Sequence, residues 1–562
     1  MSISSTVSLV RFCITFTLLL YVTGIDASPS LVSIEEHRVK DDTSAYEAEH
    51  QKILHRLQPL EVFPPLANHE ATNLPDHRSD NTRGALTELR DALSNMQDQY
   101  FSLWLGKWTS AIDWTAAVTN TYISATLSSL TRSHDVTSEH SQDGKELDND
   151  INMYFAQTTA FYYGEEAFAI RMQAYDDILW VVLEWLESIK FINEHSSTQN
   201  QPWHAQQFIP AFSHRARIFY QLSEAGWDWR LCGGGMTWNP RLLPYKNAIT
   251  NQLFIAASAS MYLHFPGDDN CSPFLSASNE CSRRPHDPAF LKNAIDGYTW
   301  LNNSGMRNPQ GLYTDGFHIS GYRSNRSKTT CDERNEMVYT YNQGVILSGL
   351  RDLFAATGNA AYLSDAFVLI ANVVRATGWG RKDGKWAGLG RNGVLEDFCD
   401  ARGTCNQDGQ TFKGVFWHHL VAFCRPLGLQ GGASEEVHGQ KCKALMEWVV
   451  WNAKAALRTR DRRGRFGEWW SAARRSNLAG GDEEGGGVLP DGAVDYRNYP
   501  ALLADWKKDE VAREDVSQHS TKPATSGDPS SRGRGRTVET QGSGLSVVRA
   551  MYEFLKLSEK ES

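Results

Sequence analysis

Two adjacent aspartates, Asp176 and Asp177, stand in one of the most apolar stretches of the chain. Nearly all of the remaining residues from Ala174 to Leu186 are apolar, and Glu184 is the exception. A helix that is apolar on all its faces is buried, and burying an ionised carboxylate is costly unless the group is paired, hydrogen-bonded or protonated. No lysine or arginine lies one helical turn away to offset that cost. A polar funnel in which the two carboxyl groups do chemistry is one explanation.

Paired carboxyl groups meet the chemical requirement for hydrolysis of a glycosidic bond. One donates its proton to the departing oxygen, while the other attacks the anomeric carbon or activates water. Successive helix residues diverge by about 100°, so two adjacent aspartates at a helix end could flank one sugar, and like charges raise one of the two pKa values. The short spacing favours a retaining mechanism, whose carboxyl groups lie about 5–5.5 Å apart. The alternative is that Asp176 and Asp177 cap a helix or form a structural salt bridge.

The composition and the first residues indicate a folded, exported protein. Hydrophobic residues make up 41% and charged residues 22% of the 562 residues, which is ordinary for a globular chain. The formal charge of −10 argues against a nucleic acid partner, whose phosphates call for a basic surface. Arg11 precedes an apolar run over residues 12–22, and small residues follow. This is the layout of a secretory signal peptide, which we place at residues 1–27, and we expect a secreted or cell-wall protein.

The cysteines agree with export. Removing Cys13 with the signal peptide leaves eight, an even number that is typical of disulfide-bonded exported chains. Two pairs are close enough in sequence to clip short loops: Cys271 with Cys281, and Cys399 with Cys405. The remaining pairings stay open. Asn302 and Asn325 begin possible N-glycosylation sequences, which are relevant only in an exported chain.

The hydrophobic pattern predicts a helical protein. Apolar residues recur at three- and four-residue spacing in segments 86–105, 111–130, 167–191, 209–222, 245–263, 290–301, 341–356, 361–376, 412–423, 435–457 and 545–557. The sequence shows little of the alternation between apolar and polar residues that is typical of strands. A solenoid would show a repeat of fixed length, and the sequence has none. We therefore predict an all-α fold, an (α/α)6 toroid or barrel of helical hairpins around a central funnel. Such a fold alone does not establish a function.

Composition also divides the chain. Residues 28–85 are polar and dotted with prolines, and we interpret them as an N-terminal arm. Residues 86–506 form the predicted catalytic domain. Residues 507–544 are crowded with charged residues, Ser, Gly and Pro, which predicts a disordered insertion. A final helix over residues 545–558 should return to the catalytic domain.

Five segments, in order along the chain, resemble glycoside hydrolase family 76, the endo-α-1,6-mannanases, in a form common in fungi. They are SAIDWTAAVTNTYIS from Ser110, FAIRMQAYDDILWVVLEWLESIKF from Phe168, LCGGGMTWNPRLLPYKNAITNQLFIAASASMYL from Leu231, YTYNQGVILSGL from Tyr339 and GQTFKGVFWHHL from Gly409. The matches cover about residues 86–505 and the final helix. The arm and the insertion lie outside the family pattern.

The resemblance implies an (α/α)6 fold and a retaining mechanism in which Asp176 is the nucleophile and Asp177 the general acid/base. The matched segments also supply candidate substrate-binding residues with carboxylate, amide and aromatic groups. These are Asp113, Trp114, Tyr175, Trp238, Asn239, Tyr341, Asn342 and Gln343. Each could equally be a core or capping residue. The three glycines from Gly233 to Gly235 permit a sharp turn that brings Trp238 to a cleft rim.

The resemblance implies α-1,6-mannan or mannose oligosaccharides as the partner, and the mechanism requires no cofactor and no metal. We expect a monomer without a stable membrane anchor. Two alternatives stay open: a cell-wall mannan transglycosylase, in which another sugar intercepts the covalent intermediate, and a non-catalytic glycan-binding protein. The intact aspartate pair argues against the second. Endo or exo action cannot be deduced from the residues.

Overall fold

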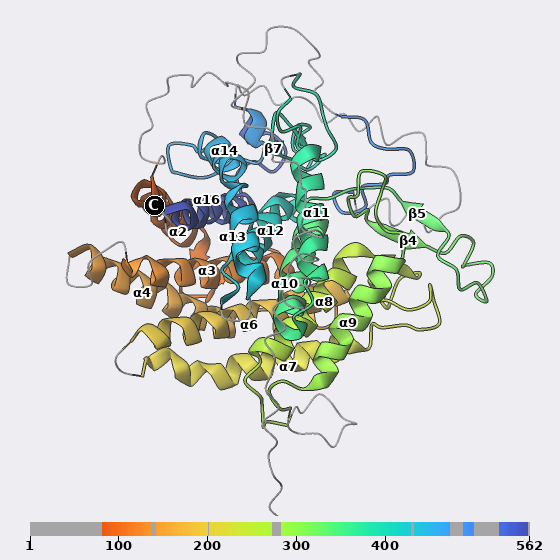
Figure 1. The fold of residues 1–562 in the computed structure, drawn as a ribbon, viewed down its shortest axis with the longest axis horizontal. Coiled ribbons are helices and arrows are strands. Elements are labelled where there is room, and N and C mark those ends of the chain that lie inside the picture. The colour runs from red at the N-terminus through yellow and green to blue at the C-terminus, as the bar shows by residue number, and fades with distance from the viewer. Residues whose placement is uncertain are drawn as a thin grey trace, which may run out of the picture. The chain divides into compact units, whose positions relative to one another are not determined.

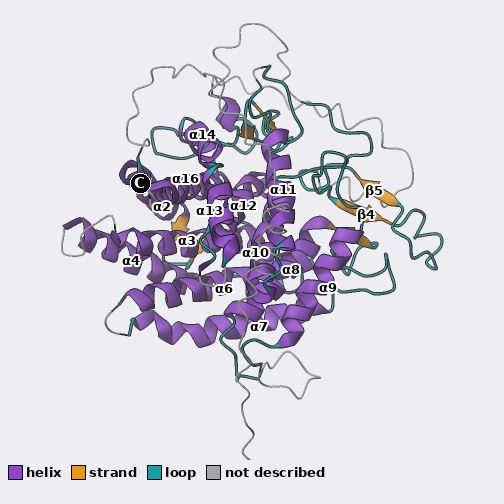
Figure 2. Cartoon of the chain, viewed as in Figure 1, coloured by secondary structure: helices purple, strands orange, loops and turns teal. Residues whose placement is uncertain are grey.

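The computed structural model describes residues 81–135, 142–199, 202–271, 283–381, 383–428, 432–472, 487–499 and 528–559. These residues are mainly helical, with a few short strands (Figures 1 and 2). The predicted signal peptide at 1–27, and all but the end of the predicted arm at 28–85, lie outside them. None of the described helices is both long and apolar enough to span a bilayer.

Within the described residues, six helices form a closed inner ring. They are α3 (Asp113–Thr131), α6 (Tyr175–Thr198), α8 (Ala248–His264), α10 (Tyr341–Thr357), α12 (Gln407–Cys424) and α16 (Val538–Glu559). Each packs against the next in this order, and α16 packs against α3 to close the ring. The predicted all-α (α/α)6 toroid is confirmed.

A second layer of helices packs outside the ring. In chain order it comprises α2 (Thr82–Tyr100) against α16, α4 (Gln142–Gly164) against α3, α7 (Ile209–Glu224) against α6, α9 (Pro288–Asn303) against α8, α11 (Ala361–Ala376) against α10, α13 (Ala433–Lys443) against α12 and α14 (Met446–Leu457) against α16. Outer helices bury one stripe, as in α2, whereas in α3 every residue from Thr115 to Thr131 is buried. Burial on all faces explains why the inner helices lack an amphipathic pattern.

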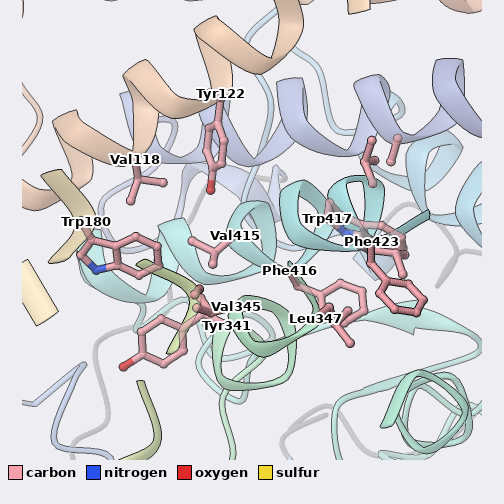
Figure 3. Packing of buried hydrophobic residues seen from close by; sticks show 14 of the residues in the cluster. Val118, Tyr122, Trp180, Tyr341, Val345, Leu347, Val415, Phe416, Trp417 and Phe423 are labelled. Carbon is pink, nitrogen blue, oxygen red and sulfur yellow. The ribbon is translucent and has the colours of Figure 1, made fainter. Parts of the chain in front are cut away.

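Small residues let the inner helices approach closely. A Cβ on Gly344 of α10 would lie 2.5 Å from the Cα of Phe416 in α12, and one on Gly414 would lie 2.7 Å from the Cα of Ser543 in α16. Figure 3 shows the resulting core, where Val345 and Tyr341 of α10 face Val415 and Phe416 of α12. The close contacts fix the positions of the helix ends.

Short antiparallel strands lie in the segments that connect the helices. The pair β1 (Phe101–Ser102) and β2 (Lys107–Trp108) precedes α3, and β6 (Gly390–Arg391) pairs with β7 (Val394–Leu395). A three-stranded sheet has the order β3 (Tyr245–Asn247), β4 (Gly316–His318), β5 (Glu333–Asn335). This sheet leads directly into α8, because Asn247 ends β3 and caps the helix.

Several predicted boundaries differ from the structure. The segment 167–191 is two helices, α5 (Ala167–Ile170) and α6, separated by a turn. The segment 435–457 likewise divides into α13 and α14, and 101–105 belongs to the β1–β2 hairpin. The polar outer helix α4 was not among the predicted segments, because its contacts to the ring involve only a few of its residues.

The last helix begins earlier than predicted. It starts at Val538, inside the segment 507–544 that the composition predicts to be disordered. The polar residues at its start are buried and bonded: Gln541 donates to the Ala92 carbonyl at 3.1 Å, and Ser543 donates to the Gln410 carbonyl at 2.8 Å. A pattern of apolar spacing misses such a helix, because its first turns are held by hydrogen bonds.

Disulfides connect distant and neighbouring segments. Cys399 bonds to Cys405, as their spacing suggests, and Cys424 bonds to Cys442. Cys232 bonds to Cys331 across 99 residues. Cys271 is also disulfide-bonded, while Cys281 lies outside the described residues. The Cys232–Cys331 bond fixes the glycine-rich loop that leads toward Trp238.

Candidate active site

The starts of the inner helices meet at one end of the ring. Asp176 and Asp177 occupy the first turn of α6, Tyr341 begins α10, and Asp408 lies in the first turn of α12. The indole nitrogen of Trp114, at the start of α3, donates to Asp408 Oδ1 at 2.9 Å. Because the inner helices run in the same direction, residues distant in sequence form one polar site.

Asp176 is the centre of this site. The residue is 3% exposed, and its Oδ2 accepts hydrogen bonds from Trp238 Nε1 at 3.0 Å and from the Arg497 guanidinium at 3.2 Å. Arg497 also lies over the Trp238 ring, 4.7 Å from its centroid. Burial raises the pKa of Asp176, and the charge of Arg497 opposes that rise. Arg497 is the compensating cation that the neighbouring sequence of α6 lacks.

Asp177 has a different environment. Its Oδ2 accepts a bond from the Ala174 backbone N–H at 3.3 Å. Burial raises the pKa of Asp177 well above its usual range, and the charge of Asp176 adds to the rise. The charge of Asp408 raises it further, while Arg497 lowers it. The pKa of Asp177 is therefore raised further than that of Asp176, whose neighbour Arg497 favours the ionised carboxylate.

Arg497 is held in place from several directions. Its backbone carbonyl accepts from Asn406 Nδ2 at 2.6 Å, and its backbone N–H donates to the Tyr339 hydroxyl at 3.4 Å. Tyr339 in turn donates to Asp495 at 2.6 Å, and Asn498 donates to the same carboxylate. The loop that carries the guanidinium is thereby fixed to the residues before α10 and α12.

Asp113 and Trp114 lie at the edge of the site. Gln173, in the turn before α6, donates to Asp113 Oδ2 at 2.6 Å. The Trp114 ring stacks on Trp180 with centroids 5.7 Å apart, and its indole nitrogen donates a hydrogen bond to Asp408. Both residues remain partly exposed, so a ligand bound at this end of the ring could contact them.

Tyr341 and Asn342 also face the site. The charges of Arg497, Asp315, Asp176 and Asp408 all act on the Tyr341 phenol, whose pKa burial raises well above its usual range. Its hydroxyl is buried and has no hydrogen-bond partner within the described residues. Asn342 is buried beside Asp315, whose carboxylate accepts from the Tyr245 hydroxyl at 2.5 Å.

Three other predicted substrate-binding residues have structural contacts. Gln343 is fully buried; its Oε1 accepts from the Tyr313 N–H at 2.8 Å and its Nε2 donates to the carbonyls of Tyr313 and Tyr339. This amide therefore holds backbone and is not free for a ligand. Asn239 closes a turn by accepting from the Arg241 N–H at 2.9 Å. Tyr175 packs beside Gly226, next to Asp176.

Potential metal ligands are grouped at one place within the described residues, Cys399, Asp400 and Cys405. Both sulfurs are in a disulfide, and Lys413 Nζ donates to both Asp400 oxygens, at 2.8 and 2.7 Å. This donor set is occupied by protein contacts. It does not fit a metal ion.

The sequence pattern does not predict Arg497, Asp408 or Asp315 as site residues. Asp408 lies near the start of a predicted helix, next to the Asn406 cap, and this position is a signal that could have found it. Arg497 lies in a loop without periodicity, where only the need for a cation near Asp176 pointed to its existence.

Comparisons with known proteins show which family and which relatives this chain is similar to. The model of glycosyl hydrolase family 76 matches residues 145–427, half of the chain. Mannan endo-1,6-alpha-mannosidase DFG5 of Saccharomyces cerevisiae is 26% identical over 214 residues, covering 37% of this chain and 38% of that protein. The Candida glabrata protein DCW1, of the same description, is 21% identical over 257 residues, covering 44% of this chain and 46% of its own length. This chain thus aligns with less than half of either relative.

A solved structure is similar over a larger share. It is an inactive variant of the alpha-1,6-mannanase GH76A of Salegentibacter sp. HEL1_6 in complex with alpha-1,6-mannotriose. The identity is 16%, the similarity covers 84% of this chain and 99% of that chain, and the TM-score is 0.49. On the match of the family model, the chain belongs to glycosyl hydrolase family 76.

Proposed function

We propose that this protein hydrolyses α-1,6-mannosidic bonds of mannan with retention of configuration. The observation that carries the proposal is the asymmetric pair, in which Arg497 and Trp238 bind Asp176 whereas Asp177 has no cation of its own at hydrogen-bond distance among the described residues. The mannan endo-1,6-alpha-mannosidase description of the fungal relatives supports the substrate. Secretion to the cell wall is part of the same proposal and rests on residues 1–27 of the sequence.

The two aspartates have complementary tasks in this mechanism. Asp177 donates its proton to the oxygen of the leaving sugar, while the Asp176 carboxylate attacks the anomeric carbon and forms a glycosyl ester. Asp177, now ionised, then takes a proton from water, and the resulting attack on the anomeric carbon releases Asp176. A nucleophile must be ionised and an acid protonated at one pH, and the larger rise in the pKa of Asp177 favours this division of roles.

The surrounding groups suit a sugar. Trp114 offers a partly exposed ring, and Asp113 offers a carboxylate to hydroxyl groups. The Tyr341 hydroxyl, which has no partner among the described residues, supplies a donor close to the aspartates. A few fixed polar groups beside aromatic surfaces are typical of small-molecule sites.

The proposal is tested by incubating unbranched α-1,6-mannan with the wild type and with Asp176→Asn and Asp177→Asn variants. Oligosaccharide release by the wild type, lost in both variants with unchanged thermal unfolding, is the expected result. Redistribution of oligosaccharides into longer products would establish a transglycosylase. Retention of mannan without any turnover would establish a glycan-binding protein.

A further inference from the structure

A cavity away from the aspartates lies on the outer wall of the ring. Its volume is about 350 Å³, and it is lined by residues of the end of α7, of α9, of the inner helix α8 and of the loop after α7. Figure 1 shows the helices α7, α8 and α9. The lining residues are Glu224, Trp227, Trp229, Phe254, Lys292, Asn293 and Asp296. This size is within the range of about 300–1,000 Å³ usual for small-molecule sites. None of these residues takes part in the proposed mechanism.

Two tryptophans give the cavity an aromatic wall. The Trp229 side chain is 66% exposed and meets Trp227 edge to face, with ring centroids 5.1 Å apart. Trp227 packs in turn on Phe254 of the inner ring, at 5.8 Å. Its indole nitrogen is buried without an acceptor within the described residues, which is costly for a donor.

The polar lining is mixed in character. Asn293 donates to the Tyr220 hydroxyl and to Glu224, both at 3.0 Å, and Lys292 pairs with Asp296 one turn on. Two carboxylates, one amide and one ammonium group offer both donors and acceptors, and their formal charges sum to −1. An anionic ligand would meet the two carboxylates. A neutral sugar, with an apolar ring face and hydroxyl edges, fits both the aromatic wall and this lining.

The loop that carries Trp229 is fixed before any ligand binds. Gly234 and Gly235 have positive φ angles, and a Cβ on Gly235 would lie 2.6 Å from the Trp300 ring. Trp300 donates to the Cys232 carbonyl at 3.0 Å, and Cys232 is disulfide-bonded to Cys331. A rigid, exposed aromatic ring loses little conformational entropy on binding.

The same loop reaches the catalytic pair. Gly226 packs against the Tyr175 ring, and the loop ends at Trp238, which donates to Asp176. A mannan polymer bound at Trp229 would therefore be anchored on the protein segment that also borders the active site. Such anchoring raises the local concentration of a polymer near the catalytic aspartates.

We propose that this cavity, with Trp229 as its platform, is a second glycan-binding site that binds neutral mannose units of a polymer outside the catalytic cleft. The identity of the sugar rests on the proposed function. The site itself rests on the cavity, its aromatic wall and its fixed loop.

The test is the binding stoichiometry of Asp177→Asn protein with α-1,6-mannotetraose by titration calorimetry. We expect two sites in this background and one after addition of Trp229→Ala, and at least tenfold weaker retention of that variant on unbranched α-1,6-mannan. Asp296→Asn, which replaces one carboxylate oxygen of the cavity lining by an amide nitrogen, should also weaken the second site. Trp104→Ala is the matched control, because Trp104 is 94% exposed in the β1–β2 turn and lies outside the cavity; it should bind two equivalents.

Identical stoichiometry and retention in the Trp229→Ala and Trp104→Ala proteins would overturn the second site, whatever the wild type hydrolyses. If the wild type does not hydrolyse mannan but binds mannotetraose through Trp229, the proposed function is refuted and the second site stands. Circular dichroism of each variant establishes that the fold is intact.

Discussion

Removing the charge of Arg497 should raise the pKa of Asp176 and move the acid limb of activity to higher pH. Arg497→Met keeps most of the side-chain volume and deletes the guanidinium that lies 3.2 Å from Asp176 Oδ2. Without that cation, burial favours protonated Asp176. A protonated carboxyl group cannot attack the anomeric carbon, so activity at a given acidic pH should fall.

The magnitude follows from the distance. Two unit charges 3.2 Å apart interact by about 1 kcal/mol at the dielectric constant of water and by about 5 kcal/mol at an effective value near 20. At about 1.4 kcal/mol per pKa unit, removal of Arg497 should raise the pKa of the first proton lost from the pair by about one to four units. The acid limb of kcat/KM on α-1,6-mannan oligosaccharides should move by the same amount. Arg497→Lys should recover part of the shift.

A matched control separates this effect from loss of stability. Arg391 is also buried, and its Nε lies 3.2 Å from Glu396 Oε2, so this ion pair joins β6 to the residue after β7 and its carboxylate is not Asp176. Arg391→Met should lower the unfolding temperature and leave the acid limb in place. A shift below about half a unit in Arg497→Met, with the fold intact, would refute the assigned role of Arg497, since even the lower electrostatic limit predicts more.

Three further predictions concern the acid, its neighbour and the ring packing. Asp177→Gly should lower kcat by at least about 100-fold, and azide should restore turnover with an activated mannoside to give the α-azide; a β-azide, identified by NMR, would make Asp177 the nucleophile. Asp408→Asn removes a negative charge that raises the pKa of Asp177, so this pKa should fall and the alkaline limb of kcat should move to lower pH, whereas an unchanged or higher limb would contradict the assignment. Gly344→Ala places a Cβ 2.5 Å from the backbone of α12 and should destabilise the protein by about 1–3 kcal/mol. Gly439→Ala, in the helix α13 with open space around it, should stabilise by up to about 1 kcal/mol; equal effects in denaturant unfolding would contradict the close packing.

The ring was predictable from sequence because its inner helices carry a strong signal. Segments such as α8 are apolar on all sides and are separated by turn residues, and the structure adds only their order in space. The helix α4 and the start of α16 were not predictable in the same way. Their contacts are polar or confined to a narrow stripe, so the spacing of apolar residues does not report them.

The site was predictable only in part, for a physical reason. Asp176 and Asp177 are conspicuous because a buried helix rarely contains adjacent carboxyl groups, and Trp238 follows a glycine loop whose turn is visible in the sequence. Arg497 lies 321 residues from its partner Asp176. Such a pairing depends on the tertiary packing of a loop, so the sequence around either residue does not predict it. Gln343 shows the converse error, since an amide at a helix start satisfies backbone as readily as a ligand.

The retaining mechanism is tested most directly by the anomeric configuration of the first sugar that the wild type releases from α-1,6-mannan, measured by proton NMR before mutarotation. A retaining mechanism predicts the α-anomer, because attack by Asp176 and then by water inverts the anomeric carbon twice. The β-anomer as first product would show a single displacement and contradict the assignment of Asp176 as nucleophile.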